Sequence, residues 1–418
     1  MASKPRIIYI HPIFIPYGGA EKVLIELFQR TKKDFECHMY TLFYADYLKN
    51  EKNLHYASKT PPALHKIFGY KANPFNGKYI KKLGAVLAKN YRENDIIMFT
   101  NFPGSLILHE AIKINPEIKK GRNIFFSFEP DRILHFNKLK KTRYLPEDLN
   151  TIKFKVATNF FWNWRKLDNY VINNETSEIF TLSDYVSRQT IAVFDKTNAK
   201  TRKATELYVD LSKFKFKSKQ ESREKLENHY KLGLKKEDIV VLSQARVERS
   251  KGILELVEAV KQINKEKSCP KIKLLIGGKG NLFEMVKKES EKEGNIFMLG
   301  FIPNDLLHHL YASADIFVTL PRKETGGPLT ILEGMYAEAI VIGTDEAGPP
   351  ELIENGKTGF LADARNIKDI AKKIKTAYNL RESNNENYKN IIRKAREKVV
   401  KMYTFEKFYE RLITNLTR

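Results

Sequence analysis

Short apolar runs alternate with amphipathic stretches through the first half of this sequence, and the alternation restarts in the second half. This pattern limits the possible folds more than any other feature of the chain. Apolar runs such as Arg6–Phe14 and Ile239–Ser243 are typical of buried strands. The stretches that follow them, such as Gly19–Arg30 and Ile253–Ile263, have helical spacing. Strands alternating with helices favour a parallel sheet covered by helices, and the interruption predicts two such α/β units with a cleft between them.

The expected elements follow this alternation along the chain. In the first half we expect strands at Arg6–Phe14, Glu36–Phe43, Asp95–Thr100, Asn123–Phe128 and Glu178–Leu182, and helices at Gly19–Arg30, Gly84–Tyr91, Leu106–Ile114 and Tyr185–Phe194. In the second half we expect strands at Ile239–Ser243, Ile272–Ile276, Ile296–Leu299, Ile316–Leu320 and Ile340–Gly343, and helices at Lys219–Tyr230, Ile253–Ile263, Leu282–Glu293, Leu306–Ala312, Leu329–Tyr336, Pro350–Asn355, Ile367–Tyr378 and Tyr388–Leu416. Residues 44–80 and 135–170 are expected to be irregular.

Length and composition agree with this division. The chain has 418 residues, which suits two or three domains. We expect one domain at 1–205, a second at 206–390, and a C-terminal helix at 391–418 that packs back on the first. Hydrophobic residues are 42% and charged residues 29%, fractions typical of a folded protein.

Three features bear on where the protein works. No apolar run approaches 18 residues, and the mean hydropathy is -0.44, so no membrane-spanning helix is expected. Lys4 and Arg6 precede an apolar stretch, but Pro12 and Pro16 favour a buried strand over a secretory signal. Two cysteines supply neither a disulfide framework nor a zinc-finger pattern, which fits a reducing cytoplasm.

The formal net charge of +23 favours anionic partners, namely phosphate groups, nucleic acid or an acidic lipid surface. The alternative is a lysine-rich protein that is simply kept soluble by its charge.

Two glycine-rich turns follow expected strands. Gly18 and Gly19 open the first helix, where glycines let a ligand approach backbone N–H groups; a plain strand-to-helix turn is an equal alternative. The segment is not G-x-G-x-x-G, so a dinucleotide is not expected. The run Gly277–Gly280 could cradle a phosphate, but it lacks the full P-loop pattern and could equally be a hairpin-like turn.

Two further motifs carry charge at strand ends. Arg246 and Lys251 flank a loop where ligands bind in open α/β sheets, and two cations there suit a diphosphate; a solvated loop is the alternative. Glu324 precedes a glycine turn, and Glu333 lies about one turn into the following helix. Carboxylates accept hydrogen bonds from sugar hydroxyls, so one could hold the transferred sugar and the other a ribose. Alternatively, Glu324 caps the helix and Glu333 is a surface residue.

These motifs, in this order, resemble those of the retaining glycosyltransferases of family four, which have the GT-B fold of two facing Rossmann-like domains. The resemblance covers most of the chain and is firmest from about 205 to 365. The matching segments are Gly18–Glu21, Tyr208–Phe214, Ala245–Arg246 with Lys251–Gly252, Gly277–Gly280, Leu299–Phe301, Ala314–Asp315, Glu324–Glu333, Gly348–Ile353, Asn355–Gly356 and Gly359–Leu361.

The resemblance implies a role for each matching residue. Arg246 and Lys251 would hold the donor diphosphate, Glu333 the ribose and Glu324 the donor sugar, and the backbone around Phe301 and Ile302 would meet the base. The remaining donor-binding candidates are Gly18, Gly19, Gly278, Gly327, Leu329 and Thr330. The family needs no metal, and this chain has no Asp-x-Asp pair, so we expect neither a metal nor another cofactor.

Two positions depart from the family's pattern. Eight residues separate Glu324 from Glu333, where seven are usual, and Pro328 removes a backbone donor from the turn. Phe128 stands where relatives often carry a histidine. The contact that this histidine makes to the donor sugar or the acceptor is then either absent or supplied by Glu129, His11 or His135. The acceptor-side candidates are His11, Glu129 and Arg132.

The implied reaction transfers a hexose, such as mannose, glucose or N-acetylglucosamine, from a nucleotide diphosphate sugar to an acceptor hydroxyl with retention. The basic aromatic stretch Lys138–Lys166, with Trp162 and Trp164, could lie on an anionic membrane, which suits a lipid-linked or cell-surface glycan as acceptor; an ordinary basic insert is equally expected. The expected location is the cytoplasm or the inner face of the membrane.

Three other functions are compatible with parts of the sequence. A GT-B epimerase would turn over the donor without an acceptor. A nucleic-acid-binding protein would use the charge of +23, but it leaves the glycine turns and both glutamates unexplained, so nucleic acid is not the expected partner. An inactive family member would act only as a scaffold.

Overall fold

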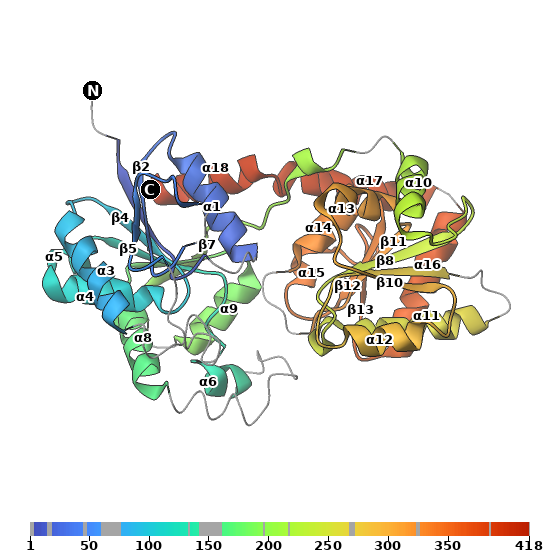
Figure 1. Ribbon diagram of the computed structural model, residues 1–418, viewed down its shortest axis with the longest axis horizontal. Helices are drawn as coiled ribbons and strands as arrows, with labels where there is room; N and C mark the ends of the chain where they lie inside the picture. Colours follow the sequence, from blue (N-terminus) through green and yellow to red (C-terminus); the bar gives the residue numbers. More distant parts are fainter. Residues whose placement is uncertain are drawn as a thin grey trace. The chain divides into compact units, whose positions relative to one another are not determined.

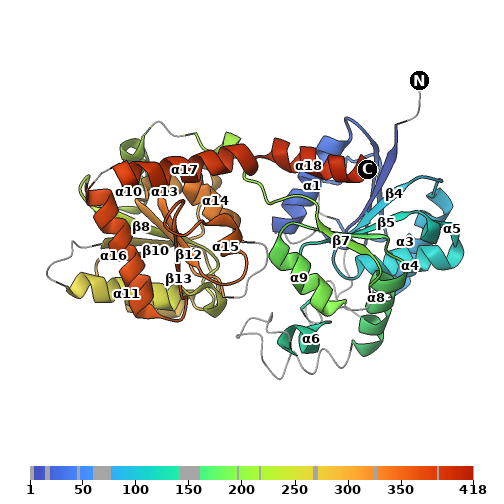
Figure 2. The same cartoon turned by 180° about the vertical axis from the view of Figure 1, so that it is seen from behind.

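The computed structural model contains two compact units, each built around one parallel sheet (Figures 1 and 2). Described residues up to Ala204 form the first unit, and those from Thr205 onward form the second. The structure describes residues 4–14, 19–44, 48–59, 77–132, 134–141, 161–194, 197–215, 218–266, 272–322, 327–383 and 386–417.

The first unit has a seven-stranded sheet in the order β3-β2-β1-β4-β5-β6-β7. Every pair of neighbours is parallel; in the central register Ile8 pairs with His38 on one side and Ile97 on the other. Its elements are β1 (Arg6–Ile10), α1 (Gly19–Thr31), β2 (Glu36–Thr41), β3 (Leu54–Tyr56), α3 (Gly77–Asn90), β4 (Ile96–Phe99), α4 (Gly104–Ile114), α5 (Glu117–Lys120), β5 (Arg122–Ser127), α6 (Phe136–Lys141), α8 (Trp162–Asn174), β6 (Glu178–Thr181), α9 (Asp184–Val193) and β7 (Lys200–Lys203).

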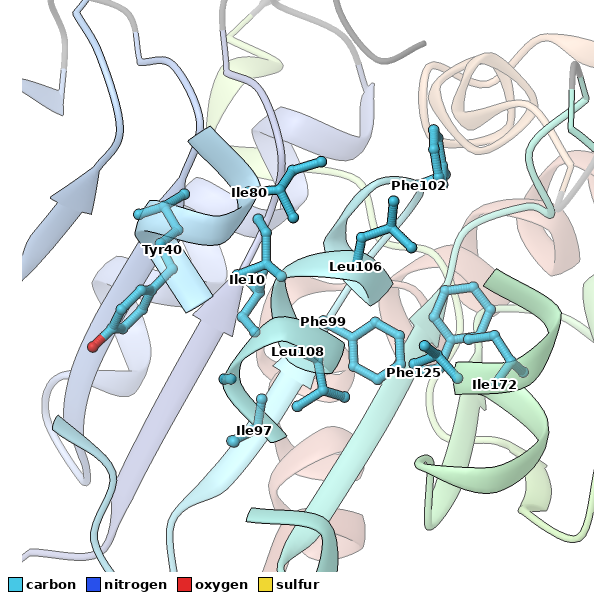
Figure 3. Close-up of a cluster of buried hydrophobic side chains, with 14 of the residues drawn as sticks. Ile10, Tyr40, Ile80, Ile97, Phe99, Phe102, Leu106, Leu108, Phe125 and Ile172 are labelled. Carbon is cyan, nitrogen blue, oxygen red and sulfur yellow. The ribbon is translucent and has the colours of Figure 1, made fainter. Parts of the chain in front are cut away.

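The core of the first unit lies between the sheet and its helices (Figure 3). Ile10, Ile97 and Phe99 from the central strands are fully buried with Leu106 and Leu108 of α4. All five residues of β1 are buried, as expected for a strand covered on both faces. The continuous apolar character of this strand is therefore a consequence of its central position.

The second unit has a six-stranded sheet in the order β10-β9-β8-β11-β12-β13, and all its neighbouring strands are parallel. Its elements are η4 (Leu211–Lys213), α10 (Lys219–Tyr230), β8 (Ile239–Gln244), η5 (Arg249–Lys251), α11 (Ile253–Lys265), β9 (Ile272–Gly277), α12 (Phe283–Ser290), β10 (Ile296–Gly300), α13 (Asn304–Ser313), β11 (Ile316–Thr319), α14 (Leu329–Tyr336), β12 (Ile340–Thr344), α15 (Pro349–Leu352), β13 (Phe360–Ala362), α16 (Ile367–Ser383), α17 (Glu386–Met402) and α18 (Phe405–Thr417).

A buried carboxylate ties helix α10 to the beginning of the second sheet. Asp315 accepts hydrogen bonds from the Val240 N–H (2.9 Å), from Arg223 (2.7 Å) and from Lys219 (3.0 Å). Burial opposes ionisation of Asp315, but the neighbouring Lys219 and Arg223 outweigh it and hold the pKa of Asp315 below its ordinary value. The charged form is therefore the one that the fold stabilises.

Most expected elements of both series are present, and α10 and α14 begin and end at the predicted residues. The expectation of irregular structure is wrong for α6 and α8 within 135–170, and for β3 and the start of α3 within 44–80. Only the second half of α8 carries its buried apolar residues, Val171 and Ile172, so its helical periodicity is weak in sequence. Residues 142–160 lie outside the described part of the chain.

Two other expectations need correction. The tail expected as one helix over Tyr388–Leu416 is two helices, because α17 ends at Met402 and α18 begins at Phe405. The short helix expected at Gly84–Tyr91 is the longer α3, whose first half intersperses three lysines with the buried Ile80 and Leu83. The domain boundaries and the packing of the C-terminal helix on the first domain remain predictions. Among the helices that the structure describes, none has the length and apolar character needed to cross a membrane.

Candidate active site

The candidate residues of the second unit gather at one edge of its sheet. Because the strands are parallel, the loops that follow β8, β9, β10 and β11 all leave from the same edge. The chain builds outward from β8 through β9 to β10 and then restarts on the other side with β11. Ligands of open α/β sheets bind where the strand order reverses in this way. The loops after β8 and β11 flank that point.

The loop after β8 carries the two predicted cations. Arg246 has a side chain that is 65% exposed and pairs with Glu248 at 2.7 Å. Lys251 ends the turn η5 and is partly buried. The next residue, Gly252, has φ of 66°, and a Cβ there would lie 2.7 Å from the Leu320 carbonyl oxygen. Glycine therefore lets the turn that carries Lys251 pack directly on the end of β11.

The glycine run after β9 packs backbone to backbone on the Arg246 loop. The Ala245 N–H donates to the Gly277 carbonyl, and the Val247 N–H donates to the Lys279 carbonyl, both at 3.1 Å. A Cβ at Gly278 (φ 121°) would lie 2.0 Å from the Ala245 carbonyl oxygen, so no other residue fits without displacing the loop. The described contacts of this glycine thus fix the position of the neighbouring cationic loop.

The end of β10 presents an aromatic ring to solvent. Phe301 is 74% exposed, whereas the adjacent Ile302 is buried against Gly277. Gly300 precedes Phe301 with φ of 70°, and its carbonyl accepts a hydrogen bond from the Gly278 N–H at 2.6 Å. The ring is therefore held on a fixed turn beside the glycine run, where its face is available to a planar ligand.

Helix α14 begins beside the end of β11. Gly327 has φ of 80° and packs against Leu352, and Leu329 and Thr330 form the first turn. The N–H groups of a first turn lack partners within the helix, so they favour an anion. Glu324 lies outside the residues that the structure describes. Glu333 lies one turn into the helix and is partly buried.

Two residues of this unit with contacts to the candidate segments were not found from the sequence. Burial, together with the neighbouring Glu333 carboxylate, raises the pKa of Tyr311 well above its usual value, so the Tyr311 hydroxyl stays protonated beside Glu333. The Arg322 side chain, in a residue that is 7% exposed, pairs with Glu255 of α11. The Arg322 backbone N–H donates to the Ser250 carbonyl at 2.7 Å. Arg322 thereby links the end of β11 to the turn that carries Lys251. No local sequence signal marks either role, because both depend on contacts between distant segments.

The candidates of the first unit have different environments. Gly18 lies outside the described residues, and Gly19 is the first residue of α1. His11 is fully buried; its Nδ1 lies 2.6 Å from the Thr100 hydroxyl oxygen, and its Nε2 lies 3.4 Å from a Glu21 carboxylate oxygen.

The remaining acceptor-side candidates pair with their neighbours. Glu129 and Arg132 form a partly exposed ion pair at 2.7 Å. His135 is 1% exposed, and its Nε2 lies 2.8 Å from a carboxylate oxygen of Asp168, whose other oxygen accepts from Ser105. These histidines are therefore held inside the first unit.

The second-unit edge combines cations, the first-turn N–H groups of α14, an exposed ring and a carboxylate. Such a set can hold a phosphate group, stack on a planar base and accept hydrogen bonds from hydroxyl groups. Within the described ranges, no group of three histidine, cysteine, aspartate or glutamate side chains is placed to hold a metal ion.

Comparison with known proteins places a family match on this same unit. Residues 224–398 match the family described as "Glycosyl transferases group 1". EpsD of Bacillus subtilis, which is named as a glycosyltransferase, is 28% identical over 186 residues, or 44% of this chain and 47% of EpsD. N-acetyl-alpha-D-glucosaminyl L-malate synthase of Bacillus anthracis is 27% identical over 193 residues, or 44% of this chain and 48% of that protein. The chain thus spans about half the length of the curated relatives it matches.

Solved structures match the whole chain. HepE of Anabaena, solved in complex with UDP, has a TM-score of 0.69 at 16% identity, with 99% of each chain covered. WaaG, a glycosyltransferase involved in lipopolysaccharide biosynthesis, has a TM-score of 0.69 at 13% identity, covering 98% of this chain and 99% of WaaG. The chain therefore has the GT-B fold, with two Rossmann-like units and C-terminal helices, as predicted. The family match and the names of the relatives support the predicted class of enzyme, a transferase.

Proposed function

We propose that this chain is a retaining glycosyltransferase of family four that transfers a hexose from a nucleotide diphosphate sugar to an acceptor hydroxyl. One observation carries the proposal: the loops after β8, β9 and β10 interlock through glycines and present Arg246, Lys251 and Phe301 at one sheet edge. The family match over residues 224–398 supports it. Solved structures of HepE with UDP and with UDP-glucose, whose fold this chain shares, support a nucleotide sugar as the donor.

In this proposal the protein acts mainly by electrostatics. Arg246, Lys251 and the first-turn N–H groups of α14 stabilise the negative charge that develops on the departing diphosphate. Phe301 stacks on the base, and Glu333 accepts hydrogen bonds from the ribose. Glu324 is assigned to the donor sugar by the resemblance alone.

The remaining partners are also proposals. The reaction uses no metal or other cofactor, and the acceptor is a lipid-linked or cell-surface glycan. Helix α8 offers a membrane-facing surface: Trp162 and Tyr170 are each 45% exposed, and the Lys166 Nζ lies 3.5 Å from the centre of the Trp162 ring. Tryptophan and tyrosine favour the headgroup level of a bilayer, and lysine favours anionic lipid. Trp164, by contrast, packs on the core beside Phe102, so it is not part of this surface. The proposed location is the cytoplasm or the inner face of the membrane.

A thermal-shift screen with UDP, GDP, ADP and their common sugar conjugates tests the donor site. A ligand at 100 times its dissociation constant stabilises the folded state by about 2.7 kcal/mol. We expect one nucleotide to raise the melting temperature and a Phe301→Ala variant to reduce that rise. No shift with any nucleotide, together with steeply salt-dependent binding of RNA or DNA, would replace this proposal with the nucleic-acid function.

A second measurement separates transfer from epimerisation. The nucleotide sugar that binds is incubated with and without a lipid-linked glycan acceptor, and the products are resolved by mass spectrometry and NMR. Transfer predicts a sugar bound to the acceptor with unchanged anomeric configuration. Conversion of the donor to its epimer without any acceptor would establish the epimerase instead.

A further inference from the structure

The second unit has a hollow of about 910 Å³ that lies away from the candidate active site. Ala312 and Ala337, which line it, come just before strands β11 and β12, whereas the candidate residues follow strand ends. In a parallel sheet, residues that precede strands and residues that follow strands lie at opposite ends of the strands. The hollow and the candidate active site are therefore at opposite ends of this sheet. The hollow is bounded by α17 and by the adjacent ends of α10, α13 and α14, whose positions are visible in Figures 1 and 2.

One face of α17 forms a continuous wall of the hollow. The wall residues recur at intervals of one, three and four, which is the spacing of a single helical face. From Tyr388 to Lys401 the wall is about 20 Å long at 1.5 Å per residue. It contains both apolar and charged side chains: Tyr388, Lys389, Ile392, Arg393, Arg396, Glu397, Val400 and Lys401.

The hollow is lined by more cationic than anionic side chains. Its two carboxylates are paired already, Glu397 with Arg393 at 2.8 Å and Glu338 with Arg396. Lys389 and Lys401, near the two ends of the wall, have no ion-pair partner within the residues that the structure describes. The hollow therefore combines apolar lining residues with an uncompensated cation near each end of the α17 wall.

The wall opposite α17 is held in place. Glu338 has φ of 63°, an uncommon conformation for a residue other than glycine, and pairs with Arg396. The Arg396 guanidinium lies 4.7 Å from the centre of the Tyr336 ring. Glu338 follows the C-cap of α14, and the Ala339 N–H donates to the Gly334 carbonyl at 3.1 Å, so the helix stop sets this conformation. An occupant would thus bind with little ordering of the groove.

We propose that this groove binds an amphipathic helix of a protein partner, with an apolar stripe on the Ile392 and Val400 side chains and acidic residues opposite Lys389 and Lys401. A helix laid into an elongated apolar groove is a recurring mode of peptide recognition. Val400 is 48% exposed and would be covered by such a helix. The proposal is independent of the sugar-transfer function.

Three other occupants fit the groove less well. A lipid surface is flat, whereas this site is a recess. A small anion would leave most of a 20 Å groove empty. A second copy of this chain would bring together two molecules that each carry a net charge of +23, which repel one another.

The probe is a fluorescein-labelled 18-residue peptide of leucine, alanine and glutamate, with leucines on one helical face and glutamates beside them. Fluorescence anisotropy measures its binding to the protein. We expect the full-length protein to bind it. The double variant Lys389→Glu/Lys401→Glu should weaken binding at least tenfold. Val400→Asp, which leaves both lysines in place, should also weaken binding. The matched control is Lys368→Glu/Lys372→Glu on the exposed face of α16, which changes the net charge equally and should bind like wild type.

Several outcomes would overturn the proposal. Equal weakening by both double variants would show general attraction to a basic protein, and no binding at about 1 mM peptide would show that the groove does not bind such a helix. Binding of phosphatidylglycerol vesicles, but not the peptide, with dependence on Lys389 and Lys401 would make the occupant a membrane. Thermal shifts with the identified nucleotide should be the same in all variants, which verifies folding and an intact donor site.

Discussion

The two units share a parallel sheet with one reversal of strand order, yet they differ in what they expose where their strands end. In the second unit Phe301 and Arg246 are among the exposed residues of the edge. In the first unit His11 and His135 are fully buried against Thr100 and Asp168. The same architecture therefore exposes polar and aromatic side chains at one sheet edge and uses buried histidines to hold segments together inside the other unit.

The units also resemble each other in one respect that allows a direct test. Each has a buried carboxylate at the beginning of its sheet: Asp95 pairs with Arg6 in the first, and Asp315 pairs with Lys219 and Arg223 in the second. Removing one partner of a buried ion pair leaves an uncompensated charge.

The largest expected effect is on stability. Asp315→Ala should lower the free energy of unfolding of the second unit by about 3–5 kcal/mol, and Asp95→Ala should do the same to the first unit. Urea unfolding monitored by circular dichroism measures both. Asp305→Ala, at an exposed position in α13, should change stability by less than about 0.5 kcal/mol. If Asp315→Ala were as mild as this control, Asp315 would not anchor the second sheet.

The next effect is on catalysis, where the units should differ most. Lys251→Ala should reduce kcat about 10²–10³-fold, since it removes a cation that stabilises the departing diphosphate. Turnover of the nucleotide sugar identified by the thermal-shift screen measures it. Lys288→Ala, on the exposed face of α12, should retain full turnover. Normal activity in Lys251→Ala would remove this residue from the donor site.

Loss of the exposed ring should weaken nucleotide binding. Phe301→Ala should raise the dissociation constant roughly tenfold, because stacking of a base on an aromatic ring contributes about 1–3 kcal/mol. Calorimetric titration with the nucleotide measures the change, and the free energy of unfolding should be nearly unaffected because the ring is already exposed. Unchanged affinity would place the base elsewhere. Phe301→Tyr, which keeps a ring, should bind nearly as well as wild type.

The smallest effect is a pH dependence located in the first unit. Burial, then the neighbouring His38 and Arg6, lowers the pKa of His55 to about 4 from its ordinary value of 6.5. The unfolded chain takes up this proton near pH 6.5, whereas the folded chain does not. The contribution of neutral His55 to the free energy of unfolding should therefore be fully present above pH 6.5 and be lost as the pH drops toward 4. The expected loss is on the order of 1–2 kcal/mol, because His55 is only partly buried.

Unfolding curves at pH 7 and pH 5 measure this loss, and His55→Gln should make it smaller. His229→Gln on the exposed face of α10 should leave it as in wild type. An unchanged pH dependence in His55→Gln would assign the effect to other groups. A loss that appeared in the second unit instead would remove this difference between the two units.

Sequence patterns predicted the elements whose signals are local. Helix α10 begins as predicted because Ser218 caps it, accepting a hydrogen bond from the Glu221 N–H at 3.1 Å. Strand β7 was missed because Lys200–Lys203 has no apolar residue; it is a strand only because its backbone pairs with β6 at the sheet edge. Strand β13 (Phe360–Ala362) was missed as well, since it has only three residues and pairs with β12 at the sheet edge.

The candidate site divides in the same way. Hydrophobic periodicity and glycine positions are local properties of the chain, so they were enough to predict the two α/β series and to place Arg246, Lys251 and Phe301 just after strands. The folded structure was needed to show that Gly278 packs on the Ala245 carbonyl, that the Arg322 backbone bonds to Ser250, and that His11 is buried. These contacts join residues distant in sequence, and their geometry is set by strand order and packing, which no local pattern encodes.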